Sequence, residues 1–172
     1  MRNHMILGWI VLALVLAPWI RNIHAPTHVT DKAYDLLLST LLSHSVPEIS
    51  VDRLASEPYQ ILDARTAREF EVSHIPGANW VGYEDFSLDR LAGIDTQAPV
   101  AIYCSVGYRS ERIAEQLRQR GYMNVVNVYG GIFEWVNTGH PVVTRDGTET
   151  EAVHAYSILW GIWLKREERV YD

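Results

Sequence analysis

A strand, a tight loop and a helix are predicted in succession across residues 99–121, and this segment constrains the fold more than any other. Residues 100–103 are continuously apolar, which is typical of a strand covered on both faces. After the loop, residues 110–120 repeat apolar side chains at helical spacing, and Gly121 is placed to end the helix. Cys104 therefore lies between a strand's carboxyl end and a helix amino terminus, where open α/β sheets bind ligands.

The loop after Cys104 predicts a reactive thiol. A short loop that returns into a helix turns its backbone N–H groups inward, and such a nest stabilises an anion, here the nucleophilic thiolate. Gly107 permits the tight turn, and Arg109 adds a fixed positive charge with a planar set of donors suited to an oxyanion. No separate general base is then required. The alternative is that Cys104, the only cysteine, is an inert core residue.

The loop and its surroundings resemble the single-domain rhodaneses, a family of sulfurtransferases. The resemblance is carried by an ordered series of segments: ILDAR at 61–65, EF at 69–70, HIPGA at 74–78, CSVGYR at 104–109, GY at 121–122, NV at 124–125, and YGG at 129–131 followed by Trp135. It extends over about residues 47–142. The ordered set is far more specific than any one of its motifs.

The resemblance implies a rhodanese-like three-layer α/β/α domain with a central, mainly parallel five-stranded sheet. It also implies that Cys104 accepts a sulfane sulfur as a persulfide and passes it to a thiol, to a cyanide-like acceptor or to a protein. The residues that would cradle the sulfur follow the cysteine: Ser105, Val106, Gly107, Tyr108, Arg109 and Ser110. In the family, the positions of Asp63 and Arg65 brace the domain, and we expect the same structural role here. No motif implies a cofactor, and the scattered histidines show no metal-ligand spacing with Cys104.

The length and charge of the loop separate several related activities. Cell-cycle phosphatases on the same fold place one more residue between cysteine and arginine, so the spacing from Cys104 to Arg109 disfavours a phosphatase or arsenate reductase. Ser105 and Val106 are uncharged where two-domain thiosulfate enzymes carry basic residues, which puts thiosulfate as the natural donor in doubt. A non-catalytic module that carries a persulfide or binds a partner is the other alternative.

The first 25 residues differ in composition from the rest of the chain. Residues 5–20 form an almost unbroken apolar run, and no acidic residue precedes Asp31. This pattern predicts a signal peptide or an N-terminal membrane anchor, with the protein exported, periplasmic or extracytoplasmic, and attached to the inner membrane if the segment is retained. A buried core helix is the alternative. The net charge of −6 argues against general nucleic-acid binding.

The remaining chain is expected to form the α/β domain over residues 46–142 and two flanking segments. Residues 26–45 predict a linker and an amphipathic helix with Thr30 as its N-cap. Within the domain, strands are expected at 47–50, 59–62, 79–81, 99–103 and 124–128, and helices at 51–56, after a capping box at 66–69, and at 84–91, 110–120 and 131–138.

Residues 143–172 follow the region of resemblance. Asp146-Gly147 predicts a turn, and the dense apolar run at 158–164 is expected to fold back on the domain, because exposed it would favour aggregation. A lid or a partner-docking segment is the alternative. The sequence leaves open whether His154 and Tyr156 reach the active site.

Overall fold

The computed structural model of the protein describes residues 27–165 and 168–172. The expected signal peptide or anchor at residues 1–25 lies outside the described residues. Among the helices of the described part, none combines the length and the apolar character needed to cross a bilayer.

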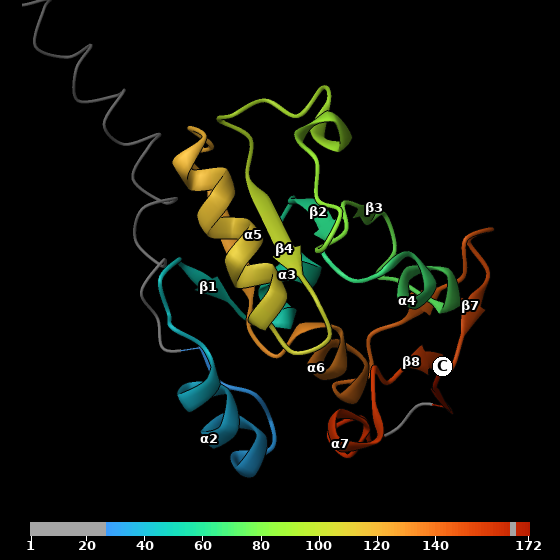
Figure 1. The fold of residues 1–172 in the computed structure, drawn as a ribbon. Helices are drawn as coiled ribbons and strands as arrows, with labels where there is room; N and C mark the ends of the chain where they lie inside the picture. Colours follow the sequence, from blue (N-terminus) through green and yellow to red (C-terminus); the bar gives the residue numbers. More distant parts are fainter. Residues whose placement is uncertain (1–26, 166–167) are drawn as a thin grey trace, which may run out of the picture.

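A five-stranded parallel sheet forms the centre of the protein (Figure 1). Its strands are β1 (Glu48–Ile49), β2 (Gln60–Asp63), β3 (Asn79–Trp80), β4 (Val100–Tyr103) and β5 (Val125–Val128), in the order β1-β5-β4-β2-β3. β4 pairs with β2 on one side and with β5 on the other, and all four of its residues are buried. The predicted apolar strand before Cys104 is therefore confirmed as the central strand.

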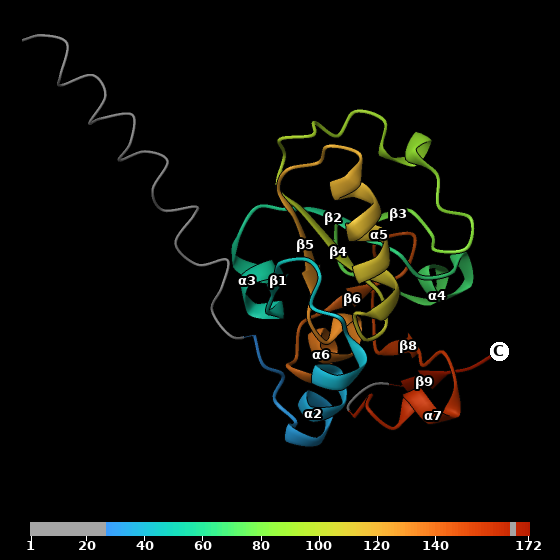
Figure 2. The same ribbon diagram turned by 60° about the vertical axis from the view of Figure 1, so that its left-hand side comes forward.

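Helices cover both faces of this sheet (Figure 2). They are α3 (Val51–Ser56), α4 (Ala67–Val72), α5 (Tyr108–Gln119) and α6 (Gly131–Asn137). Successive side chains of β4 enter two different core clusters, as the two-residue period of a strand requires. Ile102 belongs to the cluster that contains Ile113 and Leu117 of α5, whereas Tyr103 belongs to the cluster that contains Phe133 of α6. These layers form the expected α/β/α domain.

The expected helix at 84–91 is wrong: the structure has only the short 3-10 helix η1 (Leu88–Leu91) there. Side chains take over the hydrogen bonds that a helix would need. The carbonyl oxygen of Asp85 accepts from Arg90 Nη1 at 3.0 Å, and the N–H of Asp89 donates to Ser87 Oγ at 3.3 Å. Local bonds of this kind compete with a regular helix.

The N-terminal flank contains helix α2 (Lys32–Leu41), as its apolar stripe predicts. The predicted cap is wrong by one residue, because the side chain of Asp31 accepts from the N–H groups of Ala33 at 2.8 Å and Tyr34 at 3.0 Å. Thr30 instead donates its own N–H to Glu134 Oε1 at 2.7 Å. That bond attaches the start of α2 to α6.

The C-terminal flank packs beside α2 and α4. It contains β6 (Val142–Val143), β7 (Glu149–Thr150), β8 (Ala152–His154), α7 (Ile158–Gly161) and β9 (Glu168–Val170). β6 and β7 form an antiparallel hairpin, which confirms the turn predicted at Asp146-Gly147.

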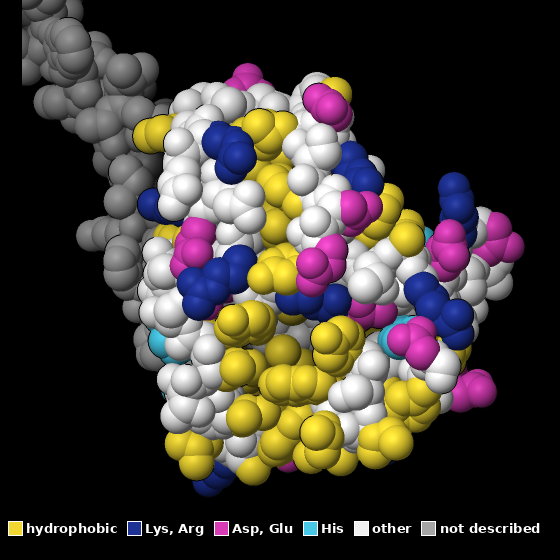
Figure 3. Space-filling view, viewed as in Figure 1, with side chains coloured by type: hydrophobic (Ala, Val, Ile, Leu, Met, Phe, Trp, Pro, Cys, Tyr) yellow, Lys and Arg dark blue, Asp and Glu magenta, His cyan; other side chains and the backbone are white. Residues whose placement is uncertain are grey.

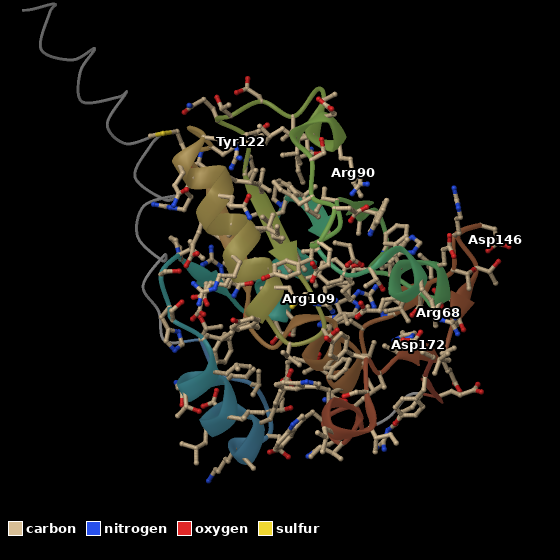
Figure 4. All side chains as sticks on the ribbon, viewed as in Figure 1. Arg68, Arg90, Arg109, Tyr122, Asp146 and Asp172 are labelled. Carbon is tan, nitrogen blue, oxygen red and sulfur yellow. The ribbon has the colours of Figure 1, made fainter. Side chains whose placement is uncertain are left out.

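Several contacts attach this flank to other parts of the chain, among them a ring stack and two ion pairs. Trp163 stacks on Tyr34 of α2 with ring centroids 5.3 Å apart, and Lys165 forms an ion pair with Asp31. At the C-terminal end, Asp172 pairs with Arg68 of α4 at 2.8 Å (Figure 4). The two flanks therefore meet each other as well as the domain.

Candidate active site

Cys104 directly follows β4 and lies four residues before Tyr108, the first residue of α5. Gly107 caps that helix with φ at 115°, a left-handed conformation that favours glycine. The N–H of Gly107 donates to Cys104 Sγ at 3.1 Å. The residue as a whole is only 1% exposed, yet it contributes to the wall of a cavity. The thiol is therefore buried at the amino end of a 12-residue helix.

The amino end of α5 offers further donors to an anion on this sulfur. The first backbone bond of the helix runs from Glu111 N–H to the carbonyl oxygen of Gly107 at 3.1 Å. The N–H groups of Tyr108, Arg109 and Ser110 precede that bond, and such groups have no partner within a helix. A thiolate or a persulfide on Cys104 would lie at the positive end of this helix.

The loop is held from behind by α6. The carbonyl oxygen of Cys104 accepts from Ile132 N–H at 2.9 Å, and that of Ser105 accepts from Phe133 N–H at 3.1 Å. A Cβ added to Gly131 would lie 2.3 Å from the carbonyl oxygen of Cys104, so this position requires glycine. The Tyr-Gly-Gly segment before α6 thus sets the close approach between the helix and the loop.

Ser110 and Asn127 fix the other side of the loop. Ser110 Oγ donates to Asn127 Oδ1 at 2.7 Å, and Asn127 Nδ2 donates to the carbonyl oxygen of Gly107 at 3.1 Å. Both side chains are buried. Ser110, expected among the cradling residues, therefore supports the loop from inside the protein, and the sequence analysis did not identify Asn127.

Arg109 makes its strongest contacts with Glu69 of α4. Its Nη1 donates to Glu69 Oε2 at 2.8 Å and its Nη2 to Glu69 Oε1 at 2.7 Å. The same Nη2 also donates to Ser105 Oγ at 2.9 Å. The planar fork expected to face an oxyanion is thus engaged with a carboxylate. Figure 4 shows Arg109 at the end of α5 that lies nearest α6 and α7.

The pairing changes the ionisation of both side chains. Burial on its own would raise the pKa of Glu69, but the hydrogen bonds and positive charge of Arg109 lower it from 4.5 to about 2. Burial would lower the pKa of Arg109, but its hydrogen bonds with Glu69 and the negative charge of that carboxylate hold the pKa above its ordinary value. The pair is therefore ionised at neutral pH and has no net charge.

Glu69 was expected in a capping box, besides its place in the EF segment of the resemblance, and the capping box is confirmed. Thr66 Oγ1 accepts from Glu69 N–H at 3.2 Å, and the Glu69 carboxylate accepts from Thr66 N–H at 2.9 Å. The same carboxylate also accepts from Ser105 Oγ at 2.9 Å. One residue thus caps α4, fixes Ser105 and neutralises Arg109.

Asp63 and Arg65 lie at the end of β2 and form a second buried ion pair. Arg65 Nη2 donates to Asp63 Oδ2 and to the carbonyl oxygen of Ser73, both at 2.7 Å. Both side chains are 0% exposed. Neither residue contributes to the wall of the cavity that contains Cys104.

The cavity at Cys104 has a volume of about 220 Å³ and is lined by residues from three parts of the chain. The loop and α5 contribute Cys104, Ser105, Val106, Tyr108 and Arg109, while α2 contributes Leu41 and the C-terminal flank contributes Tyr156 and Trp160. Five of the expected cradling residues thus either line this cavity or donate to Sγ. The sequence analysis did not identify Leu41 or Trp160.

Tyr156 reaches the site, whereas His154 does not line it. The guanidinium carbon of Arg109 lies 4.9 Å from the centre of the Tyr156 ring. Tyr156 has φ at 63°, which is uncommon for a residue other than glycine, and its N–H donates to His154 Nδ1 at 3.1 Å. His154 Nε2 lies 3.2 Å from Asp172 Oδ1. His154 therefore shapes the turn that presents Tyr156.

A larger cavity, of about 320 Å³, lies at the opposite end of the sheet. Its wall includes Glu48, Pro99 and Asn124, which stand at or just before the amino ends of β1, β4 and β5. It is remote from the single cysteine. Among the described residues, no group of three or more His, Cys, Asp or Glu is placed to hold a metal ion.

Residues 47–138 match the family model described as the rhodanese-like domain. The chain is 35% identical over 96 residues to a sulfurtransferase of Allochromatium vinosum, covering 55% of this chain and 89% of that protein. It is 32% identical over 103 residues to the thiosulfate sulfurtransferase GlpE of Actinobacillus succinogenes, covering 60% and 92%.

Other matches are partial or structural. YrkF of Bacillus subtilis, named as a candidate sulfur carrier protein, is 31% identical over 53% of this chain, and the match spans only 51% of that relative. Among solved structures, a rhodanese-related protein of Thermoplasma volcanium has a TM-score of 0.50 and 29% identity, covering 56% of this chain and 96% of that one. The matches cover only part of this chain.

Proposed function

The chain belongs to the rhodanese-like domain family, and from this premise we propose that it is a sulfurtransferase that moves a sulfane sulfur through a persulfide on Cys104. The observation that carries the proposal is the position of Cys104 Sγ. It lies at the amino end of α5, accepts a hydrogen bond from Gly107 N–H at 3.1 Å and faces a cavity. Helix amino ends favour the thiolate, which is the attacking form of cysteine.

The first step loads the enzyme. The Cys104 thiolate attacks the terminal sulfur of a donor, a new S–S bond forms, and the donor's own S–S bond breaks. The leaving group departs with the electron pair, as a thiolate from a persulfide donor or as sulfite from thiosulfate. The negative charge stays on the transferred sulfur, where the N–H groups at the start of α5 stabilise it.

The second step unloads the enzyme. A nucleophilic acceptor, such as a thiolate or cyanide, attacks the terminal sulfur of the Cys104 persulfide. The bond to Sγ breaks, Sγ keeps the electron pair, and the thiolate is restored. Neither step needs an external oxidant or a cofactor. In loading, one S–S bond forms as another breaks. In unloading, a bond between the sulfur and the acceptor replaces the S–S bond of the persulfide.

The test is the replacement Cys104→Ser, which we expect to abolish transfer. Because Cys104 is the only cysteine, intact mass after incubation with thiosulfate or a thiol persulfide reports loading at that residue alone. Thiocyanate release from cyanide reports turnover. A Cys104→Ser variant that still gains sulfur and still turns over would contradict the proposal.

A second candidate is a persulfide carrier with negligible turnover on small acceptors. Cys104 is only 1% exposed, so small acceptors in bulk solvent reach its sulfur poorly, which favours the persulfide carrier. Loading without thiocyanate release would identify the carrier. The phosphatase alternative is disfavoured by the Glu69 contact, which engages both Nη groups of Arg109. Cys104-dependent hydrolysis of an aryl phosphate would revive it.

A further inference from the structure

The cavity at Cys104 has two chemically different parts. Its inner end holds the sulfur and the N–H groups at the start of α5. Apart from Ser105 and Arg109, the rest of the cavity wall, called the outer wall below, consists of uncharged side chains: Leu41, Val106, Tyr108, Tyr156 and Trp160. Three of these, Leu41, Tyr156 and Trp160, lie outside the matched family segment at residues 47–138. The outer wall is thus largely an addition that this chain makes to the domain.

Among the described residues, Arg109 is the one cation in the cavity wall, and it is already neutralised. Arg109 gives both Nη groups to Glu69, and its guanidinium stacks against the ring of Tyr156. Glu69 is 1% exposed and Arg109 is 13% exposed, so the pair is largely shielded from water. The described part of the wall therefore offers a dianionic donor no net positive charge, and the backbone N–H groups are already used by the transferred sulfur.

Apolar side chains also continue outward from the cavity. Figure 3 shows hydrophobic side chains gathered over α2 and α7 on this face. Leu36 of α2 and Ile158 of α7 are exposed hydrophobic residues of these two helices. Apart from Ser105, Arg109 and the backbone N–H groups, the cavity wall is uncharged, and hydrophobic side chains gather on the surface over α2 and α7.

Resting on the proposed function, we propose that the sulfur donor is a low-molecular-weight persulfide whose leaving group is an apolar hydrocarbon chain. Tyr156, Trp160 and Leu41 are the residues that select it. The Cys104 thiolate takes the terminal sulfur at the amides, and the donor's hydrocarbon lies against the outer wall until it leaves as a thiolate. Apolar contact removes both surfaces from water, whereas a charged leaving group would lose its hydration without a partner.

The test compares donors that share one reacting bond but differ in leaving group. The rate of sulfur gain by the full chain is measured by intact mass with n-hexyl persulfide, glutathione persulfide and thiosulfate. We expect n-hexyl persulfide to load Cys104 faster than the two charged donors, by roughly tenfold or more, as for hydrocarbon groups in apolar pockets.

Two neighbouring residues of α7 supply a matched pair of variants. Trp160→Ala removes part of the cavity wall, and the hexyl-to-glutathione rate ratio should fall by roughly tenfold. Leu159→Ala changes a residue that is 80% exposed and does not line the cavity, so the ratio should stay as in the wild type. A ratio that is near one in the wild type, or that Trp160→Ala leaves unchanged, overturns the inference.

A third variant covers the case in which Trp160→Ala does not fold. Leu41→Lys places a cation in the wall at the carboxyl end of α2, where the helix dipole favours it. It should raise thiosulfate loading relative to hexyl persulfide several-fold, and no change would contradict the inference. If the wild type gains sulfur from none of the three donors, the proposed function itself fails. Loading without donor preference overturns only the inference.

Discussion

Two buried arginine–carboxylate pairs lie near the carboxyl edge of the sheet, and they differ in what surrounds them. Asp63 and Arg65 are two residues apart, 0% exposed, and joined to the carbonyl of Ser73. Glu69 and Arg109 are 40 residues apart, bridge α4 and α5, and lie beside the cavity at Cys104. One arginine–carboxylate pair is thus enclosed in the protein, and the other lies at the candidate active site.

This difference separates stability from chemistry. Burying a charge is unfavourable unless it is paired, so removing one partner of a fully enclosed pair leaves the other without compensation. A freed charge at the wall of a cavity can still find water or a ligand. We therefore expect the Asp63–Arg65 pair to act on stability alone, and the Glu69–Arg109 pair to act on both stability and donor choice.

The largest effect is expected from Asp63→Asn. The change leaves Arg65 charged and unpaired at 0% exposure, and the free energy of unfolding should fall by about 3–5 kcal/mol. Urea denaturation measures it. Sulfur loading per folded molecule should not change, because neither residue lines the cavity.

The control for Asp63→Asn is Glu57→Gln in the partly exposed Arg53–Glu57 pair. Exposed pairs contribute little, so its unfolding free energy should change by about 1 kcal/mol or less. If the unfolding free energy of Asp63→Asn equals that of Glu57→Gln, enclosed and exposed pairs do not differ in their contribution to stability. An altered donor ratio in Asp63→Asn would instead show that this pair influences the site.

The sequence could predict the enclosed pair more readily than the pair at the site. Asp63 and Arg65 form one short motif at the end of an apolar strand, and the family resemblance implied that both brace the domain. Glu69 and Arg109 belong to separate helices, and only the packing of α4 against the loop brings them together. The capping-box spacing of Thr66 and Glu69 identified the local role of Glu69 but carried no information about its distant partner.

The same reasoning applies to the sheet and to the cavity wall. The alternation of strands and helices and the position of Cys104 follow from local periodicity, so both could be predicted. The sequence predicted that Trp160 belongs to an apolar run that packs on the domain. It could not predict that Trp160 lines the cavity, because that position depends on how the C-terminal flank packs against α2. Tyr156 depends on a left-handed turn at a residue that is not glycine, which no sequence pattern indicated.

A smaller effect on stability, with a change in specificity, is expected from Glu69→Gln. Arg109 is 13% exposed and can reach water in the cavity, so the unfolding free energy should fall by about 2–3 kcal/mol, less than for Asp63→Asn. The freed guanidinium should also raise thiosulfate loading relative to n-hexyl persulfide. Stopped incubations followed by intact mass measure the ratio, and an unchanged ratio would show that Glu69 does not set the charge of the cavity.

The stability difference between the wild type and Glu69→Gln should also change with pH. The pKa of Glu69 falls from 4.5 to about 2 on folding, so its ionisation stabilises the folded state above about pH 4.5 and that contribution is lost as the pH falls toward 2. The difference in unfolding free energy should be constant above pH 5 and shrink below pH 4.5 by at most about 1.4 kcal/mol per pH unit.

Urea denaturation of both proteins from pH 7 to pH 2.5 tests this dependence, because groups other than Glu69 titrate in both and cancel in the difference. A difference that persists unchanged at pH 2.5 would mean that the glutamine variant loses packing or hydrogen bonds rather than a charge. A difference that shrinks as expected, together with an altered donor ratio at neutral pH, would assign both effects to the carboxylate that neutralises Arg109. The Asp63–Arg65 and Glu69–Arg109 pairs would then share the same chemistry and differ only in that the second pair has access to the cavity.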